Sequence, residues 1–134
     1  MIRLIQFLNE KNHFLEKFFS LNESEITRLQ AGGFDQLETF YHQREDLLKI
    51  IKYIDNEIHR SHQLHKDVSG QYTEEQKAQI RDMLRTKEAY VKRILEQDLV
   101  ILGLIDSAKS QIIQELQGVK KARKALGGYK ITAA

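Results

Sequence analysis

The sequence predicts an all-α protein, an antiparallel three-helix bundle with one long C-terminal helix. The 134 residues include no Pro, the residue that most strongly ends helices. Glycine-containing breaks at 32–33, 69–70 and 127–128 divide the chain into three segments, each with apolar residues at helical spacing. Two turns among three such stripes favour an antiparallel bundle over one continuous coiled coil. We expect a single helical domain over residues 1–134.

Composition limits the function classes. The absence of Cys excludes disulfides, thiolate metal sites and a Cys nucleophile. A net charge of +2 gives no overall attraction to nucleic acid. The apolar run within residues 1–10 is too short and interrupted for a signal peptide, and no stretch approaches the ~20 apolar residues of a membrane span. We therefore expect a cytoplasmic protein that does not insert into membranes.

The first helix is expected over residues 2–30. Asn12 and Asn22 fall inside its apolar stripe. They can lie at the edge of the stripe in water, which we prefer, or be buried and fix the helix register as Asn does in coiled coils. Gly32–Gly33 should end the helix, because Gly adopts the left-handed conformation easily. The stripe consists of Ile5, Leu8, Phe14, Leu15, Phe18, Phe19, Ile26 and Leu29.

The second helix is expected over residues 34–65, followed by a loop over 66–72. His59, His62 and His65 share one face at a spacing that can hold a metal. We prefer the simpler interpretation that these imidazoles lie at a polar helix end, and we expect no metal and no cofactor. The apolar stripe consists of Leu37, Phe40, Tyr41, Leu47, Leu48, Ile51, Ile54 and Ile58.

The third helix is expected over residues 73–126, roughly 80 Å at 1.5 Å per residue. Thr73 and Gln76 form a capping box at its start. Gly103 is the weak point of this helix, where a kink with Asp106–Ser107 as a new cap is the alternative to an unbroken helix. Asp98 falls on the stripe, where it should lie at the edge or bond a polar group of a facing helix. The stripe consists of Ile80, Leu84, Val91, Ile94, Ile101, Ile105, Ile112, Val119 and Leu126.

The second half of this helix has an apolar surface wider than one bundle face. An apolar surface too wide for its own core is usually an interface, unless the first two helices cover it from both sides. We expect Leu102, Leu104 and Ile113 to lie off the bundle face and to be at least partly exposed. The candidate partner-binding residues are these three with Ile101, Ile105, Ile112, Leu116 and Val119, which are expected to face the bundle.

A basic cluster follows the apolar segment. It can form a positively charged rim for a partner, or simply oppose the dipole at the helix C-terminus. Apart from Tyr129, the aromatic residues that single-stranded nucleic acid requires are missing. No phosphate loop, metal signature or activated nucleophile is present, so we do not expect an enzyme. The cluster consists of Lys120, Lys121, Arg123, Lys124 and Lys130.

Several segments carry a family resemblance. They are the opening helix from Phe7 to Leu29, the stretches 33–38 and 43–48, and the tail from Leu116 to Lys130. In these the chain resembles the bacterial flagellar type III export chaperones of the FlgN type, with the FliT type as the second choice. The resemblance implies a small cytoplasmic helical protein without enzymatic activity. Such a protein holds a hook–filament junction or cap protein before export.

By this resemblance, the final helix would bind the amphipathic terminal helix of the cargo, and Tyr129 would dock at the export apparatus. Three hypotheses of different kinds therefore follow from the sequence. The first is an export chaperone. The second is a structural scaffold that forms a homodimer through the same apolar surface. The third, which is weaker, is a nucleic-acid or membrane-surface binder that uses the basic tail.

Overall fold

The computed structural model describes residues 2–65 and 72–130, with the side chains of residues 2, 63–65, 123 and 125–130 excluded. Within these ranges the chain forms helices α1 (Ile2–Gln30), α2 (Leu37–His65) and α3 (Glu74–Lys130), and no strand. The all-α, three-helix prediction is confirmed. Most of the loop expected at 66–72 lies outside the described residues.

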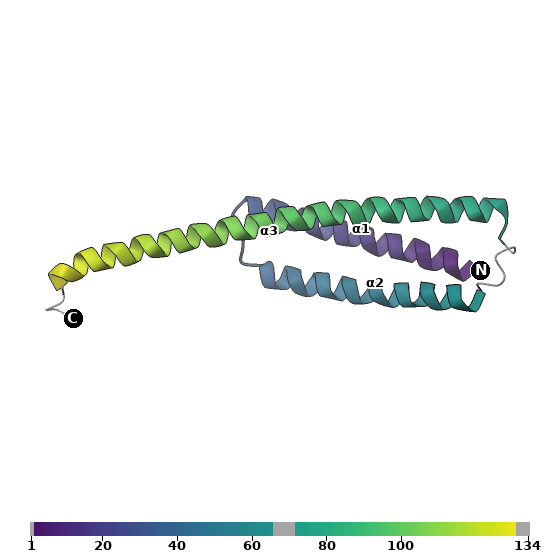
Figure 1. The fold of residues 1–134 in the computed structure, drawn as a ribbon, viewed down its shortest axis with the longest axis horizontal. Coiled ribbons are helices and arrows are strands. Elements are labelled where there is room, and N and C mark those ends of the chain that lie inside the picture. The colour runs from purple at the N-terminus through teal and green to yellow at the C-terminus, as the bar shows by residue number, and fades with distance from the viewer. Residues whose placement is uncertain (1, 66–71, 131–134) are drawn as a thin grey trace. The chain divides into compact units, whose positions relative to one another are not determined.

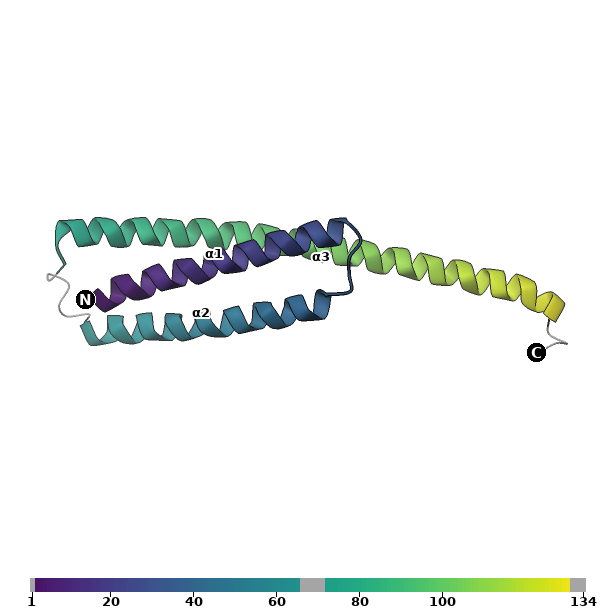
Figure 2. The same ribbon diagram turned by 180° about the vertical axis from the view of Figure 1, so that it is seen from behind.

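The chain divides into two compact units between Ile101 and Leu102. The first unit contains α1, α2 and the part of α3 up to Ile101, which lie side by side (Figures 1 and 2). Lys11 of α1 pairs with Asp55 of α2, and Phe18 further along α1 contacts Arg44 earlier in α2, so these two helices are antiparallel. Asn12 bonds the Met83 carbonyl and Asn22 bonds Gln97, so α1 and α3 run in the same direction. The second unit is the continuation of α3 from Leu102.

The core of the first unit draws on all three helices. Leu15 and Phe18 from α1, Ile51 from α2 and Ile94 from α3 are buried against one another. Burying one such side chain stabilises a fold by about 1.5–3 kcal/mol. Partly buried side chains surround this cluster at Phe14, Phe19, Leu47 and Tyr90.

The face of α3 that points into the core differs from the predicted stripe. Ile94, Gln97 and Ile101 are buried, whereas Leu84 and Val91 are 38% and 36% exposed. The predicted stripe combined residues from two neighbouring rows of α3, one that faces the core and one beside it. Adjacent rows on a helix are separated by only a fraction of a turn, so spacing in the sequence does not distinguish them. Tyr41 and Leu48 on α2 were assigned to the core for the same reason, and both are exposed.

Gly32 ends α1 as the sequence predicts. Its φ of 85° is in the left-handed region. Its N–H donates to the Leu29 carbonyl at 3.0 Å, and the Gly33 N–H donates to the Arg28 carbonyl at 2.9 Å. This pair of bonds is the Schellman motif, which satisfies carbonyls that the helix itself leaves unpaired. A side chain at Gly33 would also meet Arg28, whose Cγ lies 2.9 Å from the position of a Cβ.

The predicted capping box begins α3. The Gln76 N–H donates to Thr73 Oγ1 at 3.0 Å, and the Thr73 N–H donates to Gln76 Oε1 at 2.9 Å. Two backbone donors that the first turn leaves free are thereby satisfied.

Three helix boundaries differ from the predictions. The second helix begins at Leu37 rather than at residue 34, because its first i→i−4 bond joins the Phe40 N–H to the Gln36 carbonyl at 3.0 Å, while the Leu37 N–H and the Phe34 carbonyl form only a turn bond. The third helix begins at Glu74, with Thr73 as its cap. It continues through Gly127–Gly128 to Lys130, where the sequence predicts a break. Gly inside a helix costs about 1 kcal/mol, which weakens a helix without ending it.

The helix is likewise unbroken at Gly103, so Asp106–Ser107 lies inside α3 and does not cap a new helix. A bend of the helix axis at Gly103 stays an untested alternative.

Candidate protein-binding surface

A buried polar layer joins α1 to α3 within the bundle. Asn22 is fully buried, and its Nδ2 donates to Gln97 Oε1 at 3.1 Å and to Asp98 Oδ1 at 3.4 Å. Gln97 is also buried and donates to the Phe19 carbonyl at 3.1 Å. The preferred interpretation that Asn22 lies in water is therefore wrong, because Asn22 is buried as in the alternative; its role in fixing the register stays a prediction. Asn12 is half-buried and donates to the Met83 carbonyl at 2.9 Å.

Arg44 of α2 completes this layer. Its guanidinium lies 3.1 Å from Asp98 Oδ1 and stacks over the rings of Phe18 and Phe40, at 5.0 and 5.4 Å from their centroids. A planar, weakly hydrated guanidinium suits such a half-buried site. The prediction that Asp98 bonds a polar group of a facing helix is confirmed. The Arg44–Asp98 ion pair therefore connects α2 to α3 and stabilises their packing.

Glu25 is the buried charge that the sequence analysis missed. It is 1% exposed, its Oε2 accepts from Arg28 at 2.9 Å, and its Oε1 has no hydrogen-bond partner. Burial raises the pKa of the Glu25 carboxyl, Arg28 opposes this, and Asp35 adds to it. Its position seven residues after Phe18 was the available signal, because that spacing places it in the same row of α1.

The second unit presents an apolar face. At about 100° per residue, six apolar residues lie within an arc of about 120° around the helix. Five of them are between 45% and 57% exposed, and Ile105 is half-buried. Lys109 is the charged residue that falls within the same arc between residues 102 and 119. We call this surface the 102–119 face, and its members are Leu102, Ile105, Ile112, Ile113, Leu116 and Val119.

The partner-binding residues predicted from sequence separate into three groups. Ile101 is 1% exposed and belongs to the bundle core. Leu104 is half-buried and lies outside the arc of the 102–119 face. The remaining six form that face. The expected exposure of Leu102 and Ile113 is confirmed at 54% and 45%.

Ile112, Leu116 and Val119 were expected to face the bundle, but they are 55%, 57% and 49% exposed, so the alternative that the first two helices cover this region does not hold for them. The cause is helix length. Both α1 and α2 have 29 residues, while α3 has 57.

A second apolar surface lies on the first unit. The floor of a groove is formed by Leu15, Phe18, Ile51 and Ile94, and its walls by Leu48 of α2 and Val91 and Leu95 of α3. Leu48 and Leu95 are 49% and 60% exposed. The groove has only apolar side chains around it, and we call it the bundle groove. A depression beside it is lined by Val91, Leu95 and Leu99 together with Lys87, Glu88, Lys92 and Glu96.

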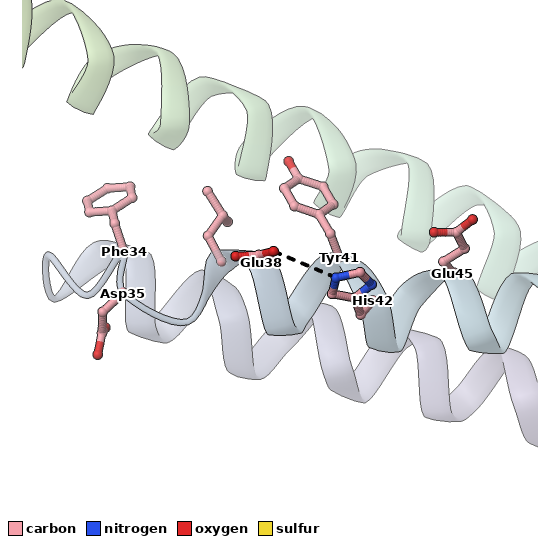
Figure 3. A pocket seen from close by; sticks show the side chains of 7 residues that line it. Phe34, Asp35, Glu38, Tyr41, His42 and Glu45 are labelled. Carbon is pink, nitrogen blue, oxygen red and sulfur yellow. Dashed lines mark ion pairs between the residues drawn. The ribbon is translucent and has the colours of Figure 1, made fainter.

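A separate pocket at the start of α2 has a lining of both apolar and polar side chains (Figure 3). Glu38 and His42 face each other across one turn of α2, with 3.9 Å between Oε1 and Nε2 (Figure 3). Both side chains are largely exposed, and an exposed pair of this kind contributes at most about 1 kcal/mol. The carboxylates of Glu38 and Glu45 on α2, and of Asp35 before it, are exposed. It is lined by Phe34, Asp35, Leu37, Glu38, Tyr41, His42 and Glu45.

The histidine row gives no described metal site. His59 and His62 are exposed on α2, and the side chain of His65 lies outside the described residues. Within the ranges 2–65 and 72–130, no three His, Asp or Glu side chains form a group that could hold a metal ion.

The basic rim is solvated where it is described, since Lys120, Lys121 and Lys124 are exposed. The side chains of Arg123 and Tyr129 lie outside the described residues, so the predicted docking role of Tyr129 has no described geometry. Among the helices as described, none has an apolar stretch long enough to cross a bilayer.

Models of protein families, curated proteins and solved structures were searched, and none of the three searches found a match to this chain.

Proposed function

We propose that this protein is a cytoplasmic export chaperone that binds the amphipathic terminal helix of a flagellar axial protein before type III secretion. The hook–filament junction and cap proteins are the cargo class. The observation that supports the proposal best is the 102–119 face, a helix surface with five apolar side chains about half exposed. The residue resemblance to chaperones of the FlgN type supplies the cargo class.

The chemistry of the face fits a helical partner. Its apolar residues recur every three or four positions, as in surfaces that pack against a partner helix. The opposite side of the segment is rich in Ser and Gln, including Ser107, Ser110, Gln111, Gln114 and Gln117. A helix with one wide apolar face and one uncharged polar face suits burial of the apolar face by another amphipathic helix. The role is binding rather than catalysis, and the exposed Lys120 and Lys121 form the rim.

The test measures capture of labelled terminal-helix peptides from axial proteins by fluorescence anisotropy. Ile113→Asp and Leu116→Asp should abolish capture and leave thermal unfolding nearly unchanged. Val100→Asp is the matched control, because Val100 is 46% exposed on the same helix but lies on the side opposite the 102–119 face. Lys120→Glu should weaken capture mainly at low salt, as a rim charge does.

Two results would contradict the proposal. One is that no axial-protein peptide binds the wild-type protein. The other is that the two Asp variants bind as well as the Val100→Asp control. The resemblance assigns Tyr129 to docking at the export apparatus and not to cargo binding, so Tyr129→Ala should impair export and leave peptide capture intact. Loss of peptide capture in this variant would contradict that assignment.

A further inference from the structure

We propose that the helix bound by the 102–119 face is acidic, with one carboxylate in its apolar row opposite Lys109 and a second opposite Lys120. This inference rests on the proposed function, because it specifies the partner of the same face. It uses only the second unit, from Leu102 onward. The observation that carries it is the position of these two exposed lysines on an apolar surface.

Lys109 and Lys120 lie inside the arc of the 102–119 face rather than at its edges. At about 100° per residue, their positions are about 20° and 40° from that of Leu116, which is at the centre of the arc. In the part of the chain that the structure describes, neither ammonium group has a hydrogen-bond or ion-pair partner. A partner that covers this face therefore meets two free cations.

The acidic residues of the second unit lie off this face. Asp106 and Glu115 are the two acidic residues at positions 102–130, where there are six basic ones. Their positions are about 20° and 40° beyond the two edges of the arc. The face is therefore apolar and positively charged, and its complement is a surface that is apolar and negatively charged. The basic residues are Lys109, Lys120, Lys121, Arg123, Lys124 and Lys130.

A second copy of the chain does not supply such a complement. Two 102–119 faces packed together would bring the Lys109 and Lys120 ammonium groups of both copies into one interface, with no carboxylate in either arc. Like charges so placed cost several kcal/mol. The charges therefore oppose self-association through this face and favour a different chain.

An anionic membrane surface fits the sign of the charge but not its distribution. A helix that lies on a membrane has its basic residues on the polar side, so that its apolar side enters the acyl region. Between residues 102 and 119 the polar side has Ser and Gln and no basic residue, whereas Lys109 is near the centre of the apolar arc. Insertion would take this ammonium group below the headgroups, where an unpaired charge is costly. A partner helix with a carboxylate at that point avoids this cost.

The two lysines also specify the spacing of the partner's acids. Lys109, Ile113, Leu116 and Lys120 follow one another at intervals of four, three and four residues. The lysines are thus about 16 Å apart along the helix axis. Two carboxylates eleven positions apart share one face of a partner helix, since eleven residues complete about three turns. The intervals read the same in both directions, so a parallel and an antiparallel partner both fit.

The two ion pairs should differ in their response to salt. Lys109 has apolar residues of the face before and after it, at Ile105 and Ile112, so a bound helix would cover its ion pair. A covered pair is screened much less than an exposed one. Lys120 follows Val119, the last apolar residue of the face, and its ion pair would stay in contact with solvent.

Labelled synthetic amphipathic helices test the proposal by fluorescence anisotropy with the full-length protein. One peptide has Glu at two positions eleven residues apart in its apolar row, and two matched peptides have Gln or Lys at both positions. The Glu peptide should bind the wild type at least about a hundred-fold more tightly than the Lys peptide. The affinity of the Gln peptide should lie between them.

Charge reversal on the protein gives the complementary measurement. The double variant with Lys109→Glu and Lys120→Glu should prefer the Lys peptide. The loss of Glu-peptide affinity in Lys109→Glu alone should persist at high salt. Lys121→Glu is the matched control and should keep the wild-type preference, because Lys121 is exposed on the same helix about 80° beyond the arc. Circular dichroism establishes that each variant is folded.

Equal affinity of the wild type for the Glu and Lys peptides would overturn the proposal. Failure to bind any of the three peptides would overturn it too, whether the protein then binds phosphatidylserine vesicles, a second copy or neither. Failure of the proposed function is a different result, in which the Glu peptide binds and no axial-protein peptide does. Conversely, axial-protein peptides that bind the wild type and Lys109→Glu equally would support the proposed function and contradict this inference.

Discussion

Asn22 and Gln97 are bonded to each other inside the bundle, with 3.1 Å between Nδ2 and Oε1, although both residues could be solvated on a helix surface. Each is at most 6% exposed. A buried amide pair contributes little to stability when it is complete and is costly when one member is removed. The pair therefore favours one alignment of α1 against α3 over alignments that would leave Asn22 Nδ2 and Gln97 Oε1 unpaired, although Asn22 Oδ1 has no hydrogen-bond partner here.

Asn22→Ala should lower the free energy of unfolding by about 1–3 kcal/mol, because Gln97 Oε1 then loses its donor. Replacement of both residues by Leu should cost less than the sum of the single replacements, since no amide is then left unpaired. Urea unfolding measures both values. Gln111→Ala, at an exposed position of α3, should change stability by at most about 0.5 kcal/mol. A neutral Asn22→Ala would show that the amide bond is not required.

Glu25 should make bundle stability depend on pH. Burial raises the pKa of this carboxyl above its ordinary 4.5, so the folded protein binds more protons than the unfolded chain. This contribution to stability is fully present below pH 4.5 and is lost as pH rises through the folded-state pKa. Glu25→Gln cannot ionise and should gain stability relative to wild type as pH rises to neutrality.

The effect of Glu25→Gln is expected to be on the order of 1 kcal/mol at neutral pH, because loss of the Arg28 contact offsets part of the gain. Thermal unfolding of both proteins across this pH range measures it. Glu115→Gln, at an exposed position of α3, is the matched control. A difference between wild type and Glu25→Gln that does not change with pH would contradict this assignment.

Gly32 and Gly103 should respond oppositely to Ala. Gly32 has a φ of 85°, and a left-handed Ala costs about 1–2 kcal/mol, so Gly32→Ala should lower the denaturation midpoint. Gly103 lies in α3 with open space around the position of a Cβ, so Gly103→Ala should stabilise the helix by up to about 1 kcal/mol. Urea unfolding and far-UV circular dichroism test the two changes. Equal responses would mean that backbone conformation does not determine the outcome.

Ile101 and Leu102 are neighbours in sequence with opposite environments, at 1% and 54% exposed. Ile101→Ala should destabilise the fold by about 2–5 kcal/mol. Leu102→Ala should change stability by at most about 0.5 kcal/mol. Thermal unfolding of the two variants gives the comparison, and similar losses for both would place Leu102 in a core.

The sequence was sufficient for the helices and their caps, because these depend on local chemistry. Glycine geometry at Gly32 and the side chains of Thr73 and Gln76 act within one turn of the chain, and the observed bonds are the expected ones. The end of α3 was less predictable. The pair Gly127–Gly128 lowers helix propensity without preventing a helix, and propensity alone gives no sharp boundary there.

The choice between adjacent apolar rows could not be made from the sequence. Leu84 and Val91 have the spacing of core residues, yet Ile94, Gln97 and Ile101 are the residues that α1 and α2 bury. Which row is buried depends on the rotation of α3 about its own axis, and that rotation is set by partners distant in sequence. The same reason explains Glu25 and Asn22, whose burial follows from the row they share with Phe18 and Leu15.

Every described side chain that is buried belongs to a residue at or before Ile101. Substitutions at the exposed positions beyond that residue therefore avoid the packing penalties that constrain a protein core. Under natural selection, the segment from Leu102 onward is free to change its recognition chemistry while the bundle that carries it keeps its sequence. Divergence between related chains should accordingly be concentrated after Ile101, and laboratory evolution of new binding specificities can begin with this segment at little risk to folding.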